Sequence, residues 1–126
     1  MAPLQPDVLS DSAQAALNAL RMEAESPNTT QSYQSALRYW AAWHWLRFGQ
    51  AIALPVADAV VLQFIADHGA RKVEAGLAHD LPVELDAQLV QLGVKGKPGA
   101  LAHATLVHRI AVLSKMHSRR ALPNPC

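Results

Sequence analysis

Four segments of this 126-residue chain repeat their apolar side chains at spacings of three and four, which is the period of an amphipathic helix. They cover about residues 8–25, 28–48, 56–68 and 101–119, and a proline or a glycine follows each within a few residues. Ala and Leu supply most of the apolar side chains and only 6% of the residues are aromatic, which favours helices over strands. No segment shows a strand pattern. We therefore predict an all-α protein, a compact bundle of four main helices.

The second segment is the longest and most aromatic, and we expect it to be the central helix of the core. Its apolar face contains Tyr33, Leu37, Trp40 and Trp43. Asp7 or Ser10 is expected to cap the first helix, and Asn28 or Thr29 the second. The buried face of the third segment is expected to contain Val60, Val61, Phe64 and Ile65, and that of the last Leu106, Ile110, Leu113 and either Met116 or His117.

Residues 70–99 separate the third and last segments and form an insertion in this pattern. Leu85, Leu89 and Leu92 recur at helical spacing between Pro82 and Gly93, which predicts a short extra helix. Residues 95–99, Lys-Gly-Lys-Pro-Gly, are expected to form a flexible basic loop. The length of 126 residues suits one domain, so we assign residues 1–126 to a single domain.

The charged residues are distributed unevenly along the chain. Residues 1–86 contain all ten acidic residues and five basic ones, whereas residues 87–126 contain six basic residues and no acid. Such a division suggests a surface that faces a polyanion. The alternative explanation is that helix C-termini attract Lys and Arg for their own stability.

No pattern in the chain indicates an active site. His103 and His108 lie five residues apart, whereas helical metal ligands require three or four. Glu84 and Asp86 lie two apart and point to different faces of a helix, so they do not form an acid–base pair. Nucleophile and phosphate-loop motifs are absent from the sequence. We predict no catalytic residue, metal, cofactor or small-molecule substrate.

The sequence also bears on location. No stretch approaches the roughly 20 apolar residues that cross a bilayer, so we expect no membrane partner. The first residues lack the features of a secretory signal, and the single cysteine, Cys126, cannot form an internal disulfide. These features predict a cytoplasmic protein.

Two motifs carry a resemblance to a known family. The first is Thr29-x-x-x-Tyr33-x-x-x-Leu37-Arg38-x-Trp40-Ala-Ala-Trp43, followed by a Gly, a Pro and a Val-x-x-Phe-Ile helix. The second is Ala104-Thr105-Leu106-x-x-x-Ile110-x-x-Leu113-x-x-Met116-His117, followed by Leu122-Pro123-x-Pro125. Together they resemble the N-terminal core-binding domain of tyrosine recombinases, the phage-integrase family, with the Cre-like branch most similar. The resemblance covers about residues 10–65 and 101–125, whereas residues 70–99 depart from it.

This resemblance implies a SAM-like helical bundle that clamps one face of a double-stranded DNA half-site. The catalytic groups of the family lie in a C-terminal domain, which is expected to follow this chain. The fragment itself would then bind DNA and not cut it. Its parent would be a site-specific recombinase or integrase that self-associates on DNA.

Candidate DNA-binding residues lie on the faces that the apolar residues leave exposed on the second and last helices. The resemblance implies DNA-facing positions at the starts of these helices, near Thr29, Gln31, Ser32, Thr105 and His108. Short polar side chains at a helix start can reach phosphates and base edges, and Lys or Arg on the last helix would contact phosphates. The full candidate set is Thr29, Gln31, Ser32, Ser35, Arg38, His103, Thr105, His108, Arg109, Lys115 and Arg119.

A second function class is a helical protein-interaction or oligomerisation module. Its sequence basis is the leucine stripe of residues 85–92, which this alternative takes as exposed, together with the modest net charge of +1. Salt dependence separates the two classes, because phosphate binding weakens steeply as salt rises and apolar association does not.

Overall fold

The structure is a computed structural model, and it describes residues 10–23, 26–74, 76–119 and 122–126. In these ranges it contains five helices: α1 (Asp11–Glu23), α2 (Pro27–Phe48), α3 (Asp58–His68), α4 (Val83–Gln91) and α5 (His103–Arg119). A two-stranded hairpin, β1 (Arg71–Val73) and β2 (Gly76–Ala78), joins α3 to α4. The predicted all-α bundle of four main helices and one short helix is confirmed.

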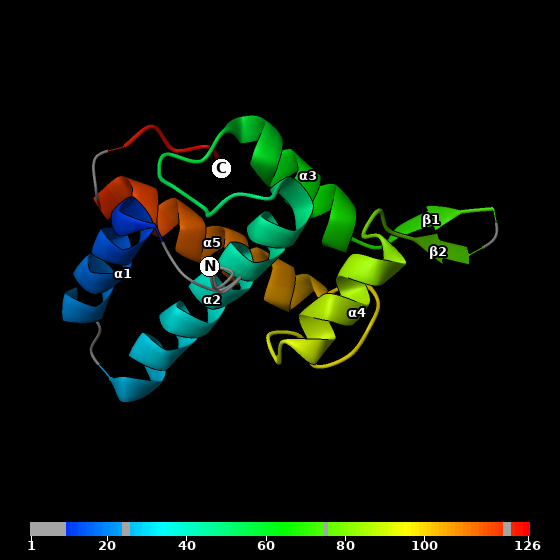
Figure 1. The fold of residues 1–126 in the computed structure, drawn as a ribbon, viewed down its shortest axis with the longest axis horizontal. Coiled ribbons are helices and arrows are strands. Elements are labelled where there is room, and N and C mark those ends of the chain that lie inside the picture. Colours follow the sequence, from blue (N-terminus) through cyan, green and yellow to red (C-terminus); the bar gives the residue numbers. More distant parts are fainter. Residues whose placement is uncertain (1–9, 24–25, 75, 120–121) are drawn as a thin grey trace, which may run out of the picture.

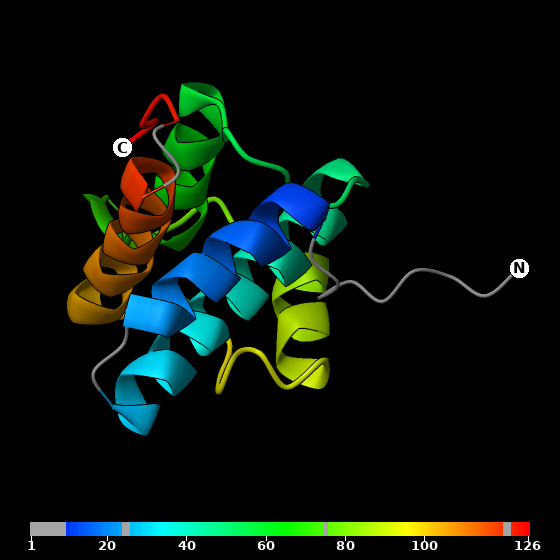
Figure 2. The ribbon, with the colours of Figure 1, turned by 90° about the vertical axis from the view of Figure 1, so that its left-hand side faces the viewer.

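Helix α2 is the central element, as predicted. It packs against α1, α4 and α5. Figure 1 shows it running obliquely across the molecule, and Figure 2 shows α4 and α5 on either side of it. Its residues 36 and 37 and every residue from 39 to 43 are buried, so its middle contacts the core on nearly all sides. Gly49 ends the helix in the left-handed conformation, with φ 71°.

Aromatic side chains from α2 and α3 form the centre of the core. Trp40 and Trp43 are fully buried, as predicted. The Trp40 ring stacks on Phe64 with centroids 3.7 Å apart, and Trp43 meets the same ring edge-on at 5.0 Å. Leu17 of α1 and Leu113 of α5 close the cluster. Met116 and His117 are both buried.

Ser10 caps α1, because its Oγ accepts a hydrogen bond from the Ala13 backbone N–H at 3.3 Å. The other candidate, Asp7, lies outside the described residues. The prediction for α2 was wrong by two or three positions: Ser26 is its cap and accepts from the Thr29 N–H, with Pro27 in the first turn. Pro27 favours this start because its fixed φ suits the first helical turn and its missing N–H needs no partner there.

Two further predictions were wrong. Ile65 is 40% exposed, because Val61 and Phe64 already fill the buried face of α3. The hairpin was also missed. Its strands have only three residues each, with Arg71 opposite Ala78 and Val73 opposite Gly76, so no alternating pattern could mark them. In Figure 1 the hairpin extends beyond α4, away from the bundle.

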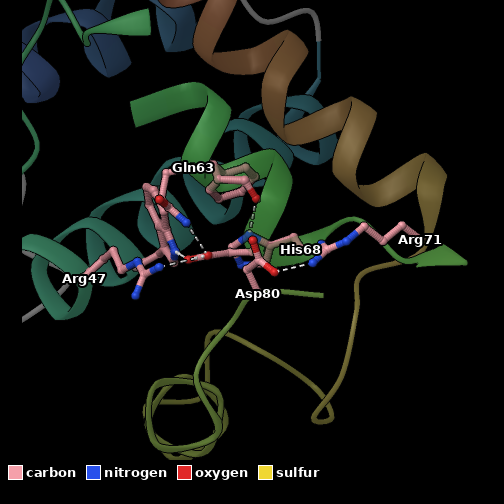
Figure 3. Close-up of polar contacts among 8 residues, drawn as sticks. Arg47, Gln63, His68, Arg71 and Asp80 are labelled. Carbon is pink, nitrogen blue, oxygen red and sulfur yellow. Dashed lines mark hydrogen bonds and ion pairs between the residues drawn. The ribbon is translucent and has the colours of Figure 1, made fainter. Parts of the chain in front are cut away.

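Polar contacts fix the end of α3 to α2. The buried Asp67 carboxylate accepts hydrogen bonds from Trp43 Nε1 at 2.9 Å and from Gln63 Nε2 at 2.7 Å, and it pairs with Arg47 at 3.3 Å. Figure 3 shows Arg47 and Gln63 converging there, with Arg71 facing Asp80 at the base of the hairpin. The buried Asp67 carboxylate is therefore satisfied by two hydrogen-bond donors and one cation, as a buried charge requires.

The insertion is held more firmly than its sequence predicted. The short helix α4 is where we expected it, but Leu89 is buried and both Leu85 and Leu92 pack against the core. The loop after it is not a flexible basic loop at Lys95. The Lys95 amino group is buried and donates to Asp86 and to the Gly99 carbonyl, so Lys97 is the only basic residue exposed in that segment. Asp86 also accepts from the Gly99 N–H at 2.7 Å, so side chains tie the loop closed.

Within the described residues, no helix is long and apolar enough to cross a membrane.

Candidate nucleic-acid interface

A groove that contains polar side chains lies between the first half of α2 and α5, and it continues along α2 to the loop after α4. It consists of three hollows that share lining residues. The first, about 440 Å³, is lined by Asn28, Thr29, Ser32, Tyr33, His108, Ala111, Val112 and Lys115. The second, about 310 Å³, shares Ser32 and His108 with it and adds Ser35, Ala36, Ala104, Thr105 and Arg109. The third, about 320 Å³, shares Ser35 and is lined by Gln31, Gln34, Arg38, Gly93 and Val94.

Direct contacts between the two helices hold the groove together. Ser32 Oγ and His108 Nε2 lie 2.8 Å apart. Lys115 donates to the Tyr33 hydroxyl at 3.1 Å, with its ammonium 5.4 Å from the centre of that ring. The buried Trp40 indole donates to the Arg109 carbonyl at 2.9 Å and so fixes the position of α5 against α2. Ser32 and His108, which are 76 positions apart in the sequence, therefore lie side by side in the groove.

Arg109 has an unusual environment for a surface cation. Its guanidinium lies over the ring of Tyr39, 3.9 Å from the ring centre. Burial lowers the pKa of Arg109, and the nearby Tyr39 oxygen partly opposes that shift. Burial likewise raises the pKa of the Tyr39 hydroxyl far above its usual value, so Tyr39 stays neutral. Arg109 is therefore a cation on a neutral aromatic surface, and it lines the second hollow.

The residues that line the groove favour a negatively charged partner. None of the residues that line these three hollows is Asp or Glu, while Arg38, Arg109 and Lys115 are all among them. A concave surface lined by one sign of charge concentrates the opposite sign in front of it. Serine, threonine and glutamine side chains supply hydrogen bonds beside the cations.

Nine of the eleven candidate residues line this groove. Thr29, Ser32, Ser35, Thr105, His108, Arg109 and Lys115 lie in the first two hollows, and Gln31 and Arg38 lie in the third. His103 is exposed in the first turn of α5 but does not line any of the three. The side chain of Arg119 lies outside the described residues.

Several groove residues were not predicted from the sequence. Tyr33 was assigned to the core, but it is half-buried and its ring forms part of the first hollow. Gln34 lies three residues after Gln31 and four before Arg38, so the helical period could have placed it on their face. Nothing in the sequence indicated Gly93 and Val94, which reach the groove only because the insertion folds back against α2.

No protein-family model, curated protein or solved structure matches this chain. Its function is therefore inferred from the groove and from the motifs in its sequence.

Proposed function

We propose that this chain binds duplex DNA in the polar groove between α2 and α5, as the core-binding domain of a tyrosine recombinase. One observation carries the proposal. Candidate residues from two segments about seventy residues apart line a single groove whose lining contains no acidic residue.

The groove residues divide by the part of DNA that they can reach. Lys115 and Arg109 supply charge for backbone phosphates, which position a protein on the duplex without reading its sequence. Gln31, Ser32 and His108 carry the donors and acceptors that can meet base edges. The resemblance assigns strand cleavage to a C-terminal catalytic domain, so in this proposal the groove binds DNA and does not cut it. A cytoplasmic location and self-association of the parent on DNA are parts of the same proposal.

The protein-interaction alternative has less support from the leucine stripe of residues 85–92. Leu89 is buried, and Leu85 and Leu92 are partly buried against the core. The exposed apolar side chains that remain, such as Met22, Leu62 and Val83, lie on three different helices. Single exposed apolar residues are common on soluble domains and do not indicate a partner.

The test is binding of the chain to a labelled 20-base-pair duplex, followed by fluorescence anisotropy over a range of salt concentrations. We expect affinity to fall as salt rises, with Lys115→Gln reducing the slope of log affinity against log salt by about 1. Arg71→Gln is the matched control, because Arg71 lies on the hairpin, outside the groove lining, in an exposed ion pair with Asp80. Salt-insensitive binding, or no binding at low salt, would contradict the proposal.

A further inference from the structure

Arg109 has a hydrogen-bond donor that the fold does not use. Its Nη1 is buried and has no hydrogen-bond partner. A guanidinium is charged at every physiological pH, so it cannot escape this cost by losing its proton. Leaving a charged donor unsatisfied in a buried position is unfavourable, and proteins normally supply an acceptor or an anion. No acidic residue lines the hollow that contains Arg109.

The hollow around Arg109 contains groups that could complete a site for an oxyanion. The hydroxyls of Ser32, Ser35 and Thr105 line it, together with the His108 ring. Hydroxyls can turn their protons toward an anion, and a guanidinium presents its donors in a planar fork that matches phosphate oxygens. The volume of about 310 Å³ is ample for one phosphate group, since a water molecule in the liquid takes up about 30 Å³.

The aromatic ring beneath the Arg109 guanidinium is itself held in place. The Tyr39 ring that carries its guanidinium is fully buried, and its hydroxyl donates to His68 Nε2 at 2.6 Å. His68 Nδ1 donates in turn to the Phe64 carbonyl at 2.8 Å, which leaves Nε2 as the acceptor. Two buried rings, hydrogen-bonded to each other and to the α3 backbone, therefore fix the surface on which the cation rests. A cation that is already positioned loses little freedom when it binds.

We propose that the hollow between Ser35, Thr105 and Arg109 binds a single phosphate group, with Arg109 as its cation and Tyr39 as the positioning residue. We call this hollow the phosphate site. The chemical class, a tetrahedral oxyanion, follows from the guanidinium that lines the hollow, the absence of an acidic residue beside it and the surrounding hydroxyls. That the phosphate belongs to a DNA backbone rests on the proposed function.

The first experiment uses inorganic phosphate as the probe, with chloride at equal ionic strength as the reference. Amide and guanidinium NMR signals of the intact chain are followed during the titration. Saturable shifts are expected at Ser35, Thr105 and Arg109. Arg109→Gln should abolish them, and Arg71→Gln, which removes the same charge outside the groove, should retain them. No saturable shift in the wild type, or equal shifts in Arg109→Gln, would overturn the proposal.

A second titration with duplex DNA separates the phosphate site from the proposed function. If the site holds a DNA phosphate, DNA displaces inorganic phosphate, and Arg109→Gln lowers the salt slope by about 1. If phosphate binds as expected but DNA does not, the phosphate site stands and the proposed function fails. If Arg109→Gln and the wild type bind DNA with the same salt slope, the groove binds DNA but the phosphate site does not hold a DNA phosphate.

The positioning role of Tyr39 needs a readout that overall stability does not move. Tyr39→Phe keeps the ring face and should leave phosphate affinity within about twofold of the wild type. Tyr39→Leu removes the ring and should weaken phosphate binding about fivefold. The guanidinium NMR signal of Arg109 should broaden or shift toward that of a solvated arginine in Tyr39→Leu alone, at a temperature where both variants are folded. Unchanged Arg109 signals and affinity in Tyr39→Leu would show that the ring does not position the cation.

Discussion

At the scale of single residues, two buried histidines act as fixed neutral links. His117 Nδ1 donates to the Leu113 carbonyl, and its Nε2 accepts from the Val56 N–H at 2.9 Å. His68 bonds in the same manner to Phe64 and Tyr39. In each ring one nitrogen must donate and the other must accept, so only the neutral form satisfies both contacts. Each of these histidines joins two segments of the chain.

The His68 link predicts a pH dependence of stability. Burial is the main cause that lowers the pKa of His68, to about 4 from an ordinary value of 6.5. Below pH 6.5 the unfolded chain therefore takes up a proton that the folded chain resists, and stability falls until about pH 4, where both forms are protonated. The full loss from this residue amounts to about 3 kcal/mol. Urea unfolding at pH 7, 5.5 and 4 measures it.

The control for this pH dependence is His68→Gln, which removes the titrating group and leaves the carboxylates unchanged. Its free energy of unfolding should fall less steeply between pH 6.5 and 4 than that of the wild type. Parallel curves for the two proteins would mean that His68 does not contribute.

Trp40 predicts the largest single loss of stability in the core. It is fully buried, stacks on Phe64 and bonds to the Arg109 carbonyl. Trp40→Ala should cost about 3–5 kcal/mol, since the truncation leaves a cavity in the centre of the bundle. Trp45→Ala is the comparison, because Trp45 is only partly buried and should cost less. A thermal midpoint that Trp40→Ala leaves unchanged would contradict this account of the core.

At the scale of elements, the insertion depends on the buried pair of Lys95 and Asp86. Burial alone would raise the pKa of Asp86, but hydrogen bonds from Lys95 and the Gly99 N–H outweigh it and lower the pKa below its usual range. Lys95→Gln leaves the buried carboxylate without its counter-charge and should cost about 3 kcal/mol. Because Lys95 is not in the groove lining, the salt slope of DNA binding should stay the same. Urea unfolding measures the loss of stability, and fluorescence anisotropy with duplex DNA measures the salt slope.

Lys97→Gln is the matched change in the same loop, since Lys97 is exposed. It should leave the free energy of unfolding nearly unchanged. Equal losses from Lys95→Gln and Lys97→Gln would contradict the buried pair.

The helices could be predicted because their apolar spacing is a local property of the sequence. The spacing from Tyr33 to Trp43 marks α2, and Gly49 marks its end. The hairpin could not be predicted, because two strands of three residues have too few positions to show alternation. The burial of Lys95 also depends on a partner nine positions away and on a loop that folds back, which no local pattern contains.

At the scale of the whole molecule, the bundle packs the first half of α2 against residues 104–115 of α5 and thereby makes the groove. The exposed polar faces of both helices could be read from the sequence, which is why most candidate residues lie there. The partly buried position of Arg109 could not, because it depends on Tyr39 and His68, from two other parts of the chain. His103 does not line the groove, and this too depends on packing between helices, because contacts such as that between Trp40 and the Arg109 carbonyl set the rotation of α5 against α2.

The central claim, that DNA binds in the groove between α2 and α5, is tested most directly by mapping amide NMR shifts of the chain during titration with a duplex. The account predicts salt-sensitive shifts grouped at residues 28–38 and 104–115, with α1 and the hairpin little affected. Shifts grouped on α1 or on the hairpin, or none on the groove at saturating DNA, would contradict it.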